Sequence, residues 1–588
     1  MKFTKYFMPF AALALLASCS NDNVIEPNVD DTPQEEVKGT YLSFNVAMAT
    51  GQNGTRDDSF KGYDDGAEGE YAINNVWLYL YRVAKGTPAG TGDTENDATL
   101  YYIKQVGTSS FTPDEDDKDK TAGLEKDAVT GNILATFQLT NMTKADKDNY
   151  NYYAYIIVNK PTVVTSDPAL TTSKLSDLLD ETNTWAASGH AVASISNNKT
   201  VTFKSATAYN DMIPQYGDNT STFYFTMTNA PLVDEDGNVT YLAALDEDNF
   251  ATSPAQAKTA AADVYVQRGV AKVSIDVDDN EFTPGHIEGM DQEEVGANAV
   301  VSIQGWSLDI INKVTYPIQH VGTSDDFTSG NWKSDWFKSA GIHSGDYSHI
   351  FWSIDPNYNK KYDSEEAEGY NGNFLTDVNV GSTFNGTSDV EYCLENTMDA
   401  KFMQKLQSTR IIFKASYMID GSTAESFIVY PGTDKAYTVA GMLQEGEITA
   451  GPHPIEDIIK DEGDNIKNVL EAVGAASKTE VVDYYPGGTT YYTAIIRHFS
   501  DDEKEGVPET GVTNLDQYDP AKHLGRYGVV RNNTYVASIS SVYGFGSPTV
   551  PTPDDPTPDD YPDPIKYNIM LDVKVLAWAM RSHGYNLK

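Results

Sequence analysis

The chain has little cysteine and little positive charge for its length. Its 588 residues include two cysteines, and 86 aspartates and glutamates stand against 42 lysines and arginines. The formal net charge of -44 argues against a nucleic-acid partner, because phosphate backbones are bound by cationic side chains. It also argues against electrostatic docking on anionic lipid, and it favours solubility without non-specific clumping.

A short segment at the N-terminus predicts export. Lys2 and Lys5 precede an apolar run that ends in Leu16-Ala17-Ser18-Cys19, the pattern of a signal peptide over residues 1–18. The ending resembles a bacterial lipobox, which implies cleavage before Cys19, lipidation of Cys19 and a lipidated tether over residues 19–38. More than one acyl chain gives stable anchoring. The alternative is an ordinary signal peptide that happens to contain a cysteine.

The sequence also lacks the motifs of common enzyme classes. It contains no nucleophile elbow, phosphate-binding loop, HExxH or CxxC pattern. His343, Asp346 and His349 lie close together but match no common metal template. The acidic segment Asp234–Asn238 lacks the ligand set of a calcium loop and is expected to be a hairpin turn. Cys393 is expected to be a small buried apolar residue. We therefore expect no enzyme, and no catalytic, cofactor-binding or metal-ligating residues.

Most of the chain consists of short alternating segments with turn-like spacers, which predicts an all-β fold. One candidate strand is Val264–Val277, and Ser173–Leu179 is a candidate short helix. Because the length exceeds one ordinary core, we expect two β-sandwich-like domains of Greek-key or transthyretin-like type, with short helices. The predicted organisation is a first strand and its loop (39–56), an N-terminal β domain (57–293), a C-terminal β domain (294–546), a Pro/Asp-rich stalk (547–566) and a final strand (567–588).

The first and last of these strands carry matching apolar ladders. Leu42, Phe44, Val46 and Met48 share one face of the first strand, and Ile569, Leu571, Val573 and Val575 share one face of the last. The last strand, which also contains Trp578, follows a run with seven prolines that is unable to fold onto itself. We predict that it pairs with a sheet of another molecule. The alternative is pairing within its own chain.

Three internal motifs then carry a resemblance over the whole length of the chain. They are Val266-Gln267-Arg268-Gly269-Val270-Ala271-Lys272-Val273, Tyr392-Cys393-Leu394-Glu395-Asn396-Thr397 and Gly528-Val529-Val530-Arg531-Asn532-Asn533-Thr534-Tyr535. With the lipobox, the stalk and the ending Val573–Trp578, they resemble the major fimbrial subunits of Bacteroidales, the fimbrillins or type V pilins, in their Mfa-like branch. Ala577 stands where that branch often has proline, which puts a kink there in doubt.

The resemblance implies a mechanism of assembly. A lipoprotein precursor reaches the outer membrane, and an Arg-specific protease cuts in the loop after the first strand. By position the cut falls between Arg56 and Asp57. Loss of the first strand opens a groove in the N-terminal domain, and the C-terminal strand of another subunit fills it by donor-strand exchange. The mature form would then lie in extracellular fimbriae that support adhesion and colonisation.

The implied partners are copies of the chain itself, accessory tip and anchor subunits, the Arg-specific protease, and a host protein or glycan receptor. Two other functions stay open. One is a lipid-anchored surface protein that binds glycan through a platform of tryptophan and tyrosine side chains, although core packing explains most such aromatics. The other is a fimbrial anchor or tip subunit.

Overall fold

The structure is a computed structural model. It describes residues 40–48, 63–64, 73–86, 94–107, 123–126, 133–140, 142–160, 170–179, 193–195, 201–203, 225–233, 239–277, 281–283, 299–312, 315–320, 353–358, 374–375, 384–398, 407–419, 422–423, 427–429, 436–438, 483–498, 525, 527–542, 544–551 and 569–578. These residues are almost entirely β-strand, with a few helices of six residues or fewer. The predicted all-β class with short helices is confirmed, and the sandwich packing stays a prediction.

The strand near the N-terminus belongs to a nine-stranded sheet. Its order is β4-β3-β7-β10-β14-β1-β6-β5, and β13 pairs with β7 beside this path. The strands are β1 (Thr40–Met48), β3 (Asn75–Ala84), β4 (Thr99–Gly107), β5 (Gly123–Lys126), β6 (Ile133–Leu139), β7 (Tyr150–Val158), β10 (Met227–Asn229), β13 (Ala243–Leu245) and β14 (Ala262–Arg268).

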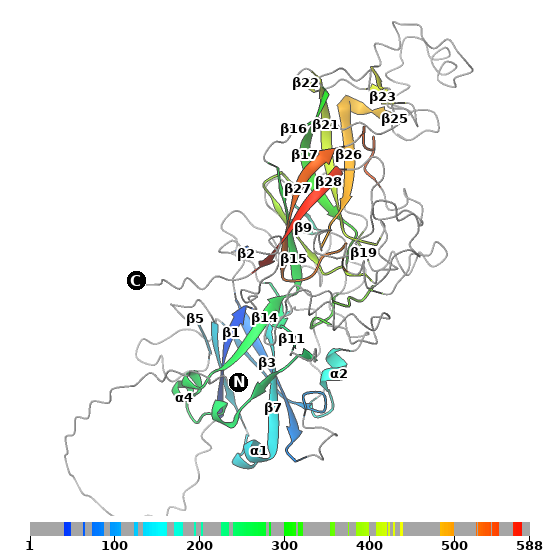
Figure 1. Ribbon diagram of the computed structural model, residues 1–588. Helices are drawn as coiled ribbons and strands as arrows, with labels where there is room; N and C mark the ends of the chain where they lie inside the picture. The colour runs from blue at the N-terminus through cyan, green and yellow to red at the C-terminus, as the bar shows by residue number, and fades with distance from the viewer. Residues whose placement is uncertain are drawn as a thin grey trace, which may run out of the picture. The chain divides into compact units, whose positions relative to one another are not determined.

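The strand at the C-terminus belongs to a five-stranded sheet, β2-β28-β27-β15-β20, and a second five-stranded sheet joins β16-β17-β21-β22 with β26 on β21. Figure 1 shows β27 and β28 running alongside each other. The strands are β2 (Tyr63–Asp64), β15 (Val270–Asp276), β16 (Glu281–Phe282), β17 (Ala299–Asp309), β20 (Val390–Leu394), β21 (Arg410–Ile419), β22 (Ser422–Thr423), β26 (Thr489–Ile495), β27 (Asn533–Val542) and β28 (Ile569–Trp578).

The remaining elements are small. Short sheets pair β8 with β9, β11 with β12, β18 with β19, and β23 with β24 and β25. Their bounds are Ala193–Ile195, Val201–Phe203, Leu232–Val233, Val239–Thr240, Ile311–Asn312, Phe374–Leu375, Phe427–Val429, Ala436–Thr438 and Asp483–Tyr485 in that order. The helices are α1 (Lys144–Asn149), α2 (Leu175–Leu178), α4 (Pro254–Thr259) and the 3-10 turns η4 (Glu247–Asn249) and η7 (Pro486–Gly488).

Local sequence explains two of these outcomes. The α2 helix lies within the predicted Ser173–Leu179 and buries Leu175 and Leu178, so that prediction is confirmed. β11 and β12 pair antiparallel on either side of residues 234–238, as the hairpin prediction requires. No helix within the described ranges is long and apolar enough to cross a membrane.

One continuous extended segment links the first two sheets. β14 ends at Arg268 and β15 begins at Val270, so the chain changes sheets at Gly269. The sequence predicted a single strand, Val264–Val277, because its alternation continues through this point. The predicted domain boundary at residues 293 and 294 stays a prediction.

The predicted stalk begins attached to the body of the protein. Ser547 exchanges two backbone hydrogen bonds with Tyr491 of β26, at 2.7 and 2.8 Å, and the Pro551 carbonyl accepts from Arg410 Nη2 at 3.3 Å. Gly546, just before, has a φ of +68°, and a Cβ there would lie 2.6 Å from the Tyr491 carbonyl oxygen, so only glycine fits this approach. The first residues of the predicted stalk, as far as Pro551, therefore belong to the body of the protein.

Candidate functional site

β1 lies inside the nine-stranded sheet and is hydrogen-bonded along both edges. It runs parallel to β14 and antiparallel to β6. The side chains of Leu42 and Phe44 are fully buried and Val46 is nearly so, and the Phe44 ring meets Phe137 edge-on with 5.8 Å between centroids. Burying three such side chains contributes roughly 5 to 9 kcal/mol before entropy costs. We call the space that β1 occupies between β14 and β6 the β1 slot.

The other face of β1 is polar and specific. Ser43 Oγ lies 2.8 Å from Thr136 Oγ1, and both residues are buried. Asn45 Nδ2 donates to Asp263 Oδ1 at 2.9 Å. Because residues directly opposite on neighbouring strands point to the same face, these two pairs define adjacent rows across the slot. A strand in the slot therefore meets a buried hydroxyl at Thr136 and an exposed carboxylate at Asp263 as well as an apolar floor.

The α4 helix lies against β1 and β6. Ser253 caps it by accepting from the Gln256 amide, and Pro254 occupies its first turn, the two features that favour helix initiation. Lys258 of α4 forms an ion pair with Glu125 of β5. Just before the helix, Ala251 exchanges backbone hydrogen bonds with Tyr41 at 2.9 and 3.0 Å, so β1 has a backbone partner opposite β6 before its pairing with β14 begins at Phe44.

The final strand is paired within its own chain in this structure. β28 lies antiparallel to β27 from Ile569 opposite Val542 to Ala577 opposite Asn533. Ile569 is buried, and Leu571 and Val573 are half-buried against the core. On its other edge β28 is paired over two residues, with β2. Of the two pairings that the sequence left open, the single chain adopts the intramolecular one.

Several predicted site residues fall outside the described part of the chain. These are Cys19, Arg56 and Asp57, together with His343, Asp346 and His349. The side chains of Met48, Val575 and Trp578 also lie outside it, although their backbones are placed in β1 and β28. Within the described ranges, no group of three His, Cys, Asp or Glu side chains is arranged to hold a metal ion.

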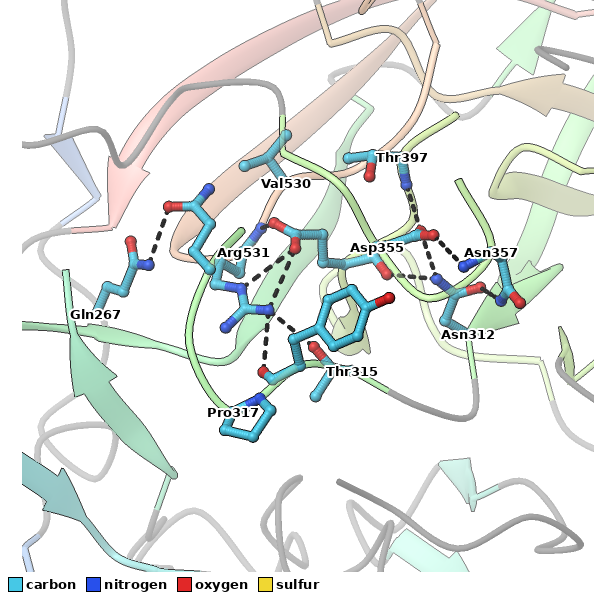
Figure 2. Close-up of polar contacts among 12 residues, drawn as sticks. Gln267, Asn312, Thr315, Pro317, Asp355, Asn357, Thr397, Val530 and Arg531 are labelled. Atoms are coloured by element: carbon cyan, nitrogen blue, oxygen red, sulfur yellow. Dashed lines mark hydrogen bonds and ion pairs between the residues drawn. The ribbon is translucent and has the colours of Figure 1, made fainter. Parts of the chain in front are cut away.

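The three sequence motifs lie side by side in the structure. β15 pairs with β20 on one edge and with β27 on the other, so strands from all three motifs are neighbours. Arg531 and Glu395 form an ion pair with side chains 1% and 0% exposed. The Arg531 guanidinium donates to Glu395 Oε1 at 3.2 and 3.3 Å and to Thr315 Oγ1 at 2.9 Å (Figure 2). Asn532, with a φ of 59°, accepts from the Arg268 amide at 3.2 Å.

A second buried carboxylate lies beside this pair. Asp355 accepts from the backbone amides of Asn357 and Thr397, at 2.6 and 2.7 Å, and from Asn312 Nδ2 at 2.7 Å (Figure 2). Burial raises the pKa of Asp355 to about 7, against the lowering effect of these hydrogen bonds, and the nearby Glu395 charge raises it further. Local sequence carries no signal for Asp355, because two of its partners, Asn312 and Thr397, lie 43 and 42 residues away.

These polar groups also connect the nine-stranded sheet to later parts of the chain. Tyr155 of β7 donates to the Pro317 carbonyl at 3.1 Å. Gln267 of β14 donates to Gln319 at 3.0 Å (Figure 2). The network joins buried side chains of the nine-stranded sheet to segments after β17, and it holds the framework around the β14–β15 crossing.

Two sequence hypotheses concern aromatic and thiol groups. Trp306 is fully buried, and its indole nitrogen donates to the Gly386 carbonyl at 3.0 Å, so this tryptophan belongs to the core and not to a glycan platform. Cys393 is also fully buried. Burial raises the pKa of the Cys393 thiol above its ordinary value, which disfavours the thiolate and fits the expected structural role.

Known proteins give one finding that bears on function. Residues 483–583 match the family "Major fimbrial subunit protein type IV, Fimbrillin, C-terminal". The match begins at β25 and includes β26, β27 and β28. No curated protein matches the chain.

Several solved structures are similar to the chain at low identity. A putative cell adhesion protein from Parabacteroides distasonis is 13% identical, with 92% of this chain and 96% of that one covered and a TM-score of 0.34. A fimbrilin (fimA) from Porphyromonas gingivalis is 12% identical, with 92% and 98% covered and a TM-score of 0.34. The tip fimbrial protein Mfa3 of that organism is 9% identical, with 92% and 100% covered and a TM-score of 0.29. TM-scores this low do not establish a shared fold, so it is through residues 483–583 that the chain is similar to the fimbrillins.

Proposed function

We propose that the chain is a structural subunit of a cell-surface fimbria, exported as a lipoprotein and assembled by strand exchange. Proteolysis after Arg56 frees β1 from the remainder of the chain, and β28 of another copy enters the β1 slot. Accessory tip and anchor subunits and the Arg-specific protease belong to this proposal, as does a host receptor for the assembled fibre. The coarser statement, a fimbrial subunit without enzymatic activity, rests on the family match over residues 483–583.

The observation that carries the proposal is the shared apolar alternation of β1, which fills the β1 slot, and β28. β1 fills the slot with alternating buried side chains at Leu42, Phe44 and Val46. β28 alternates with the same period, and its apolar face, Ile569, Leu571 and Val573, packs toward the core in its own sheet. Because side chains in strands repeat every two residues, either strand satisfies the apolar floor of the slot.

Covalent attachment explains why cutting matters. While the loop joins β1 to β3, the effective concentration of β1 at its slot is on the order of millimolar or higher. A strand from another molecule has a far lower concentration and loses the competition. Cutting in the loop removes this advantage, so the exchange is then decided by side-chain fit and backbone pairing.

The reach of the C-terminal segment fits this role. The body holds the chain as far as Pro551, and β28 begins at Ile569, which leaves residues 552–568 between them. If these 17 residues adopt a polyproline-like conformation, they span about 50 Å at about 3.1 Å per residue. That distance allows β28 to enter a second subunit.

The test uses purified full-length protein cut with an Arg-specific protease. We expect a ladder of oligomers, and we expect N-terminal sequencing of the ladder to begin at Asp57. The Arg56→Ala variant should stay uncut at this position and monomeric.

Deleting residues 567–588 provides the matched control, because it removes the donor strand and leaves the cut site and the slot in place. The deletion variant should be cut normally and should fail to extend. A ladder formed by this variant would overturn the proposal.

A further inference from the structure

The apolar floor of the β1 slot does not by itself determine the register in which a strand enters. The apolar ladder of β28 repeats every two residues, so it fits the places of Leu42, Phe44 and Val46 in more than one alignment. The polar face of the slot differs between these alignments. Asp263 and Thr136 lose their partners, Asn45 and Ser43, when β1 leaves.

We propose that Asp263 determines the register of the incoming strand by binding Lys574. This inference rests on the proposed function. β28 runs in the direction of β1, with Leu571, Val573 and Val575 at the places of Leu42, Phe44 and Val46. In this matched register, Lys574 takes the place of Asn45 and Asp572 takes the place of Ser43.

The chemistry of the two polar rows favours this alignment. Asp263 lies on the exposed side of the slot and accepts a hydrogen bond from Asn45 Nδ2 at 2.9 Å, and an ammonium group at this place supplies a donor together with a positive charge. Thr136, which is 1% exposed, shares a hydrogen bond with Ser43. The carboxylate of Asp572 accepts from that hydroxyl, and this bond offsets part of the cost of burying the charge at the place of Ser43. The matched register thus provides a partner in both rows.

The neighbouring registers fail at the same positions. A shift by two residues in one direction places Asp572 opposite Asp263, where like charges repel, and it places Met570 against the Thr136 hydroxyl, which then has no partner. The shift in the other direction brings Leu576 to the place of Asn45, so that Asp263 faces an apolar side chain in place of a hydrogen-bond donor. The matched register is thus the one of the three that sets a positive charge beside Asp263.

The charges of the residues around the slot also favour the matched register. Glu125, Leu134, Asn45 and Asp263 lie in one row across β5, β6, β1 and β14. Glu125 has its cation, Lys258 of α4, whereas Asp263 has the neutral amide of Asn45. Replacing that amide with the Lys574 ammonium neutralises the row, so exchange improves the electrostatics of the slot at this position.

A charge-swap cycle on the full chain tests the register. The variants are Asp263→Lys, Lys574→Glu and their combination, each cut with the Arg-specific protease before oligomer formation is followed. Lys574→Glu leaves the contacts of β1 intact, and we expect it to slow extension about fivefold, because an exposed ion pair is replaced by two facing carboxylates. The double variant should recover to within about twofold of wild type, because the pair is restored with its charges exchanged. Asp276→Lys, at an exposed position of β15 in another sheet, should leave the rate unchanged.

Disulfide formation between introduced cysteines gives a second measurement of the register, and this measurement does not depend on the rate of extension. Thr136→Cys combined with Asp572→Cys should form an intermolecular disulfide in the oligomers, and Thr136→Cys combined with Met570→Cys should not. The reverse pattern, or a Lys574→Glu variant that extends at the wild-type rate, would overturn the register while the proposed function stands. A cut wild-type chain that stays monomeric would overturn the proposed function itself, and the register with it.

Discussion

Arg531 and Glu395 show how a buried ion pair fixes residues from distant parts of the sequence. Their side chains are 1% and 0% exposed, and the Arg531 backbone amide also donates to Glu395 Oε2 at 3.2 Å. A buried pair adds little net stability compared with a well-packed apolar pair, because both charges are desolvated. Removing one partner is different, since it leaves the other charge buried alone.

We therefore expect Arg531→Met to reduce the free energy of unfolding by about 3 to 5 kcal/mol, measured by urea denaturation at pH 7. The surface pair of Lys85 and Glu247, at 32% and 70% side-chain exposure, serves as the control, and Lys85→Met should lower the free energy of unfolding far less than Arg531→Met does. Adding Glu395→Leu to Arg531→Met should restore part of the loss. A single Arg531→Met variant as stable as wild type would contradict this account.

Glu391 gives a prediction about pH. Burial raises the pKa of its carboxyl group to about 8, against the lowering effect of its hydrogen bonds. The folded state then holds this proton over a pH range in which the unfolded state has released it. Stability from this group is therefore fully present below the unfolded pKa of about 4.5 and falls as the pH rises to about 8. Asp355, with a pKa of about 7, acts in the same direction.

Replacing Glu391 with glutamine should flatten this dependence. The Leu308 amide and Asn385 Nδ2 both donate to Glu391 Oε2, at 2.9 Å each, so a glutamine oxygen can accept both bonds. We expect Glu391→Gln to match wild type near pH 5 and to exceed its free energy of unfolding by on the order of 3 kcal/mol at pH 9. Urea denaturation across this range is the measurement. Parallel pH profiles for the two proteins would show that Glu391 does not titrate in this way.

At the scale of elements, β28 must leave β27 before it can enter another subunit. The two strands pair along their length, with an irregularity between Ile539 and Ser541. Exchange then replaces one set of backbone hydrogen bonds with another, so its net free energy depends on side-chain fit. A covalent link between β28 and β27 should block exchange without changing the slot.

A disulfide between Ser538→Cys and Asp572→Cys, which lie opposite each other, provides this link. We expect the oxidised, cut protein to stay monomeric and to form oligomers once reductant opens the bond. The control is Ser302→Cys with Ser416→Cys, an opposed pair on β17 and β21, which should assemble in both redox states. If the locked protein extends as fast as the control, β28 is not the donor.

The elements also show what local sequence determines. Strict alternation predicted a first strand at Tyr41–Met48 and the apolar ladder of the last strand. The structure has β1 at Thr40–Met48 and β28 at Ile569–Trp578. Local sequence was enough for these predictions because two-residue periodicity is a local property. It predicted Val264–Val277 as one strand, whereas the division at Gly269 depends on which strands pair on each side. Glu395 and Arg531 are 136 residues apart, and no spacing rule reaches that far.

The apolar alternation of the last strand did not predict which sheet edge the strand pairs with. An apolar face of period two fits any apolar floor, and β27 of its own chain offers one at high effective concentration. Local periodicity identifies two strands with the same apolar alternation. The intramolecular pairing of β28 required the folded chain.

At the scale of the whole molecule, assembly has to overcome the electrostatic repulsion between subunits that both carry a large negative charge. Cutting after Arg56 removes four Lys or Arg and six Asp or Glu residues, so the net charge changes from -44 to -44 - (4 - 6) = -42. Two such subunits repel each other over roughly 30 Å at 0.01 M salt and roughly 8 Å at 0.15 M. The short-range attraction between Lys574 and Asp263 begins to act after the subunits have met.

Oligomer formation should therefore be faster in salt. With cutting completed first, we expect extension at 0.15 M sodium chloride to exceed that at 0.01 M by about three- to tenfold, because screening raises the association rate of like-charged partners. Light scattering or gel analysis over time measures this, and sucrose at matched osmolality controls for effects other than ionic strength. Extension that slows with salt would mean that attraction between complementary patches governs the encounter, and the acidic surface would then be a recognition element instead of a barrier.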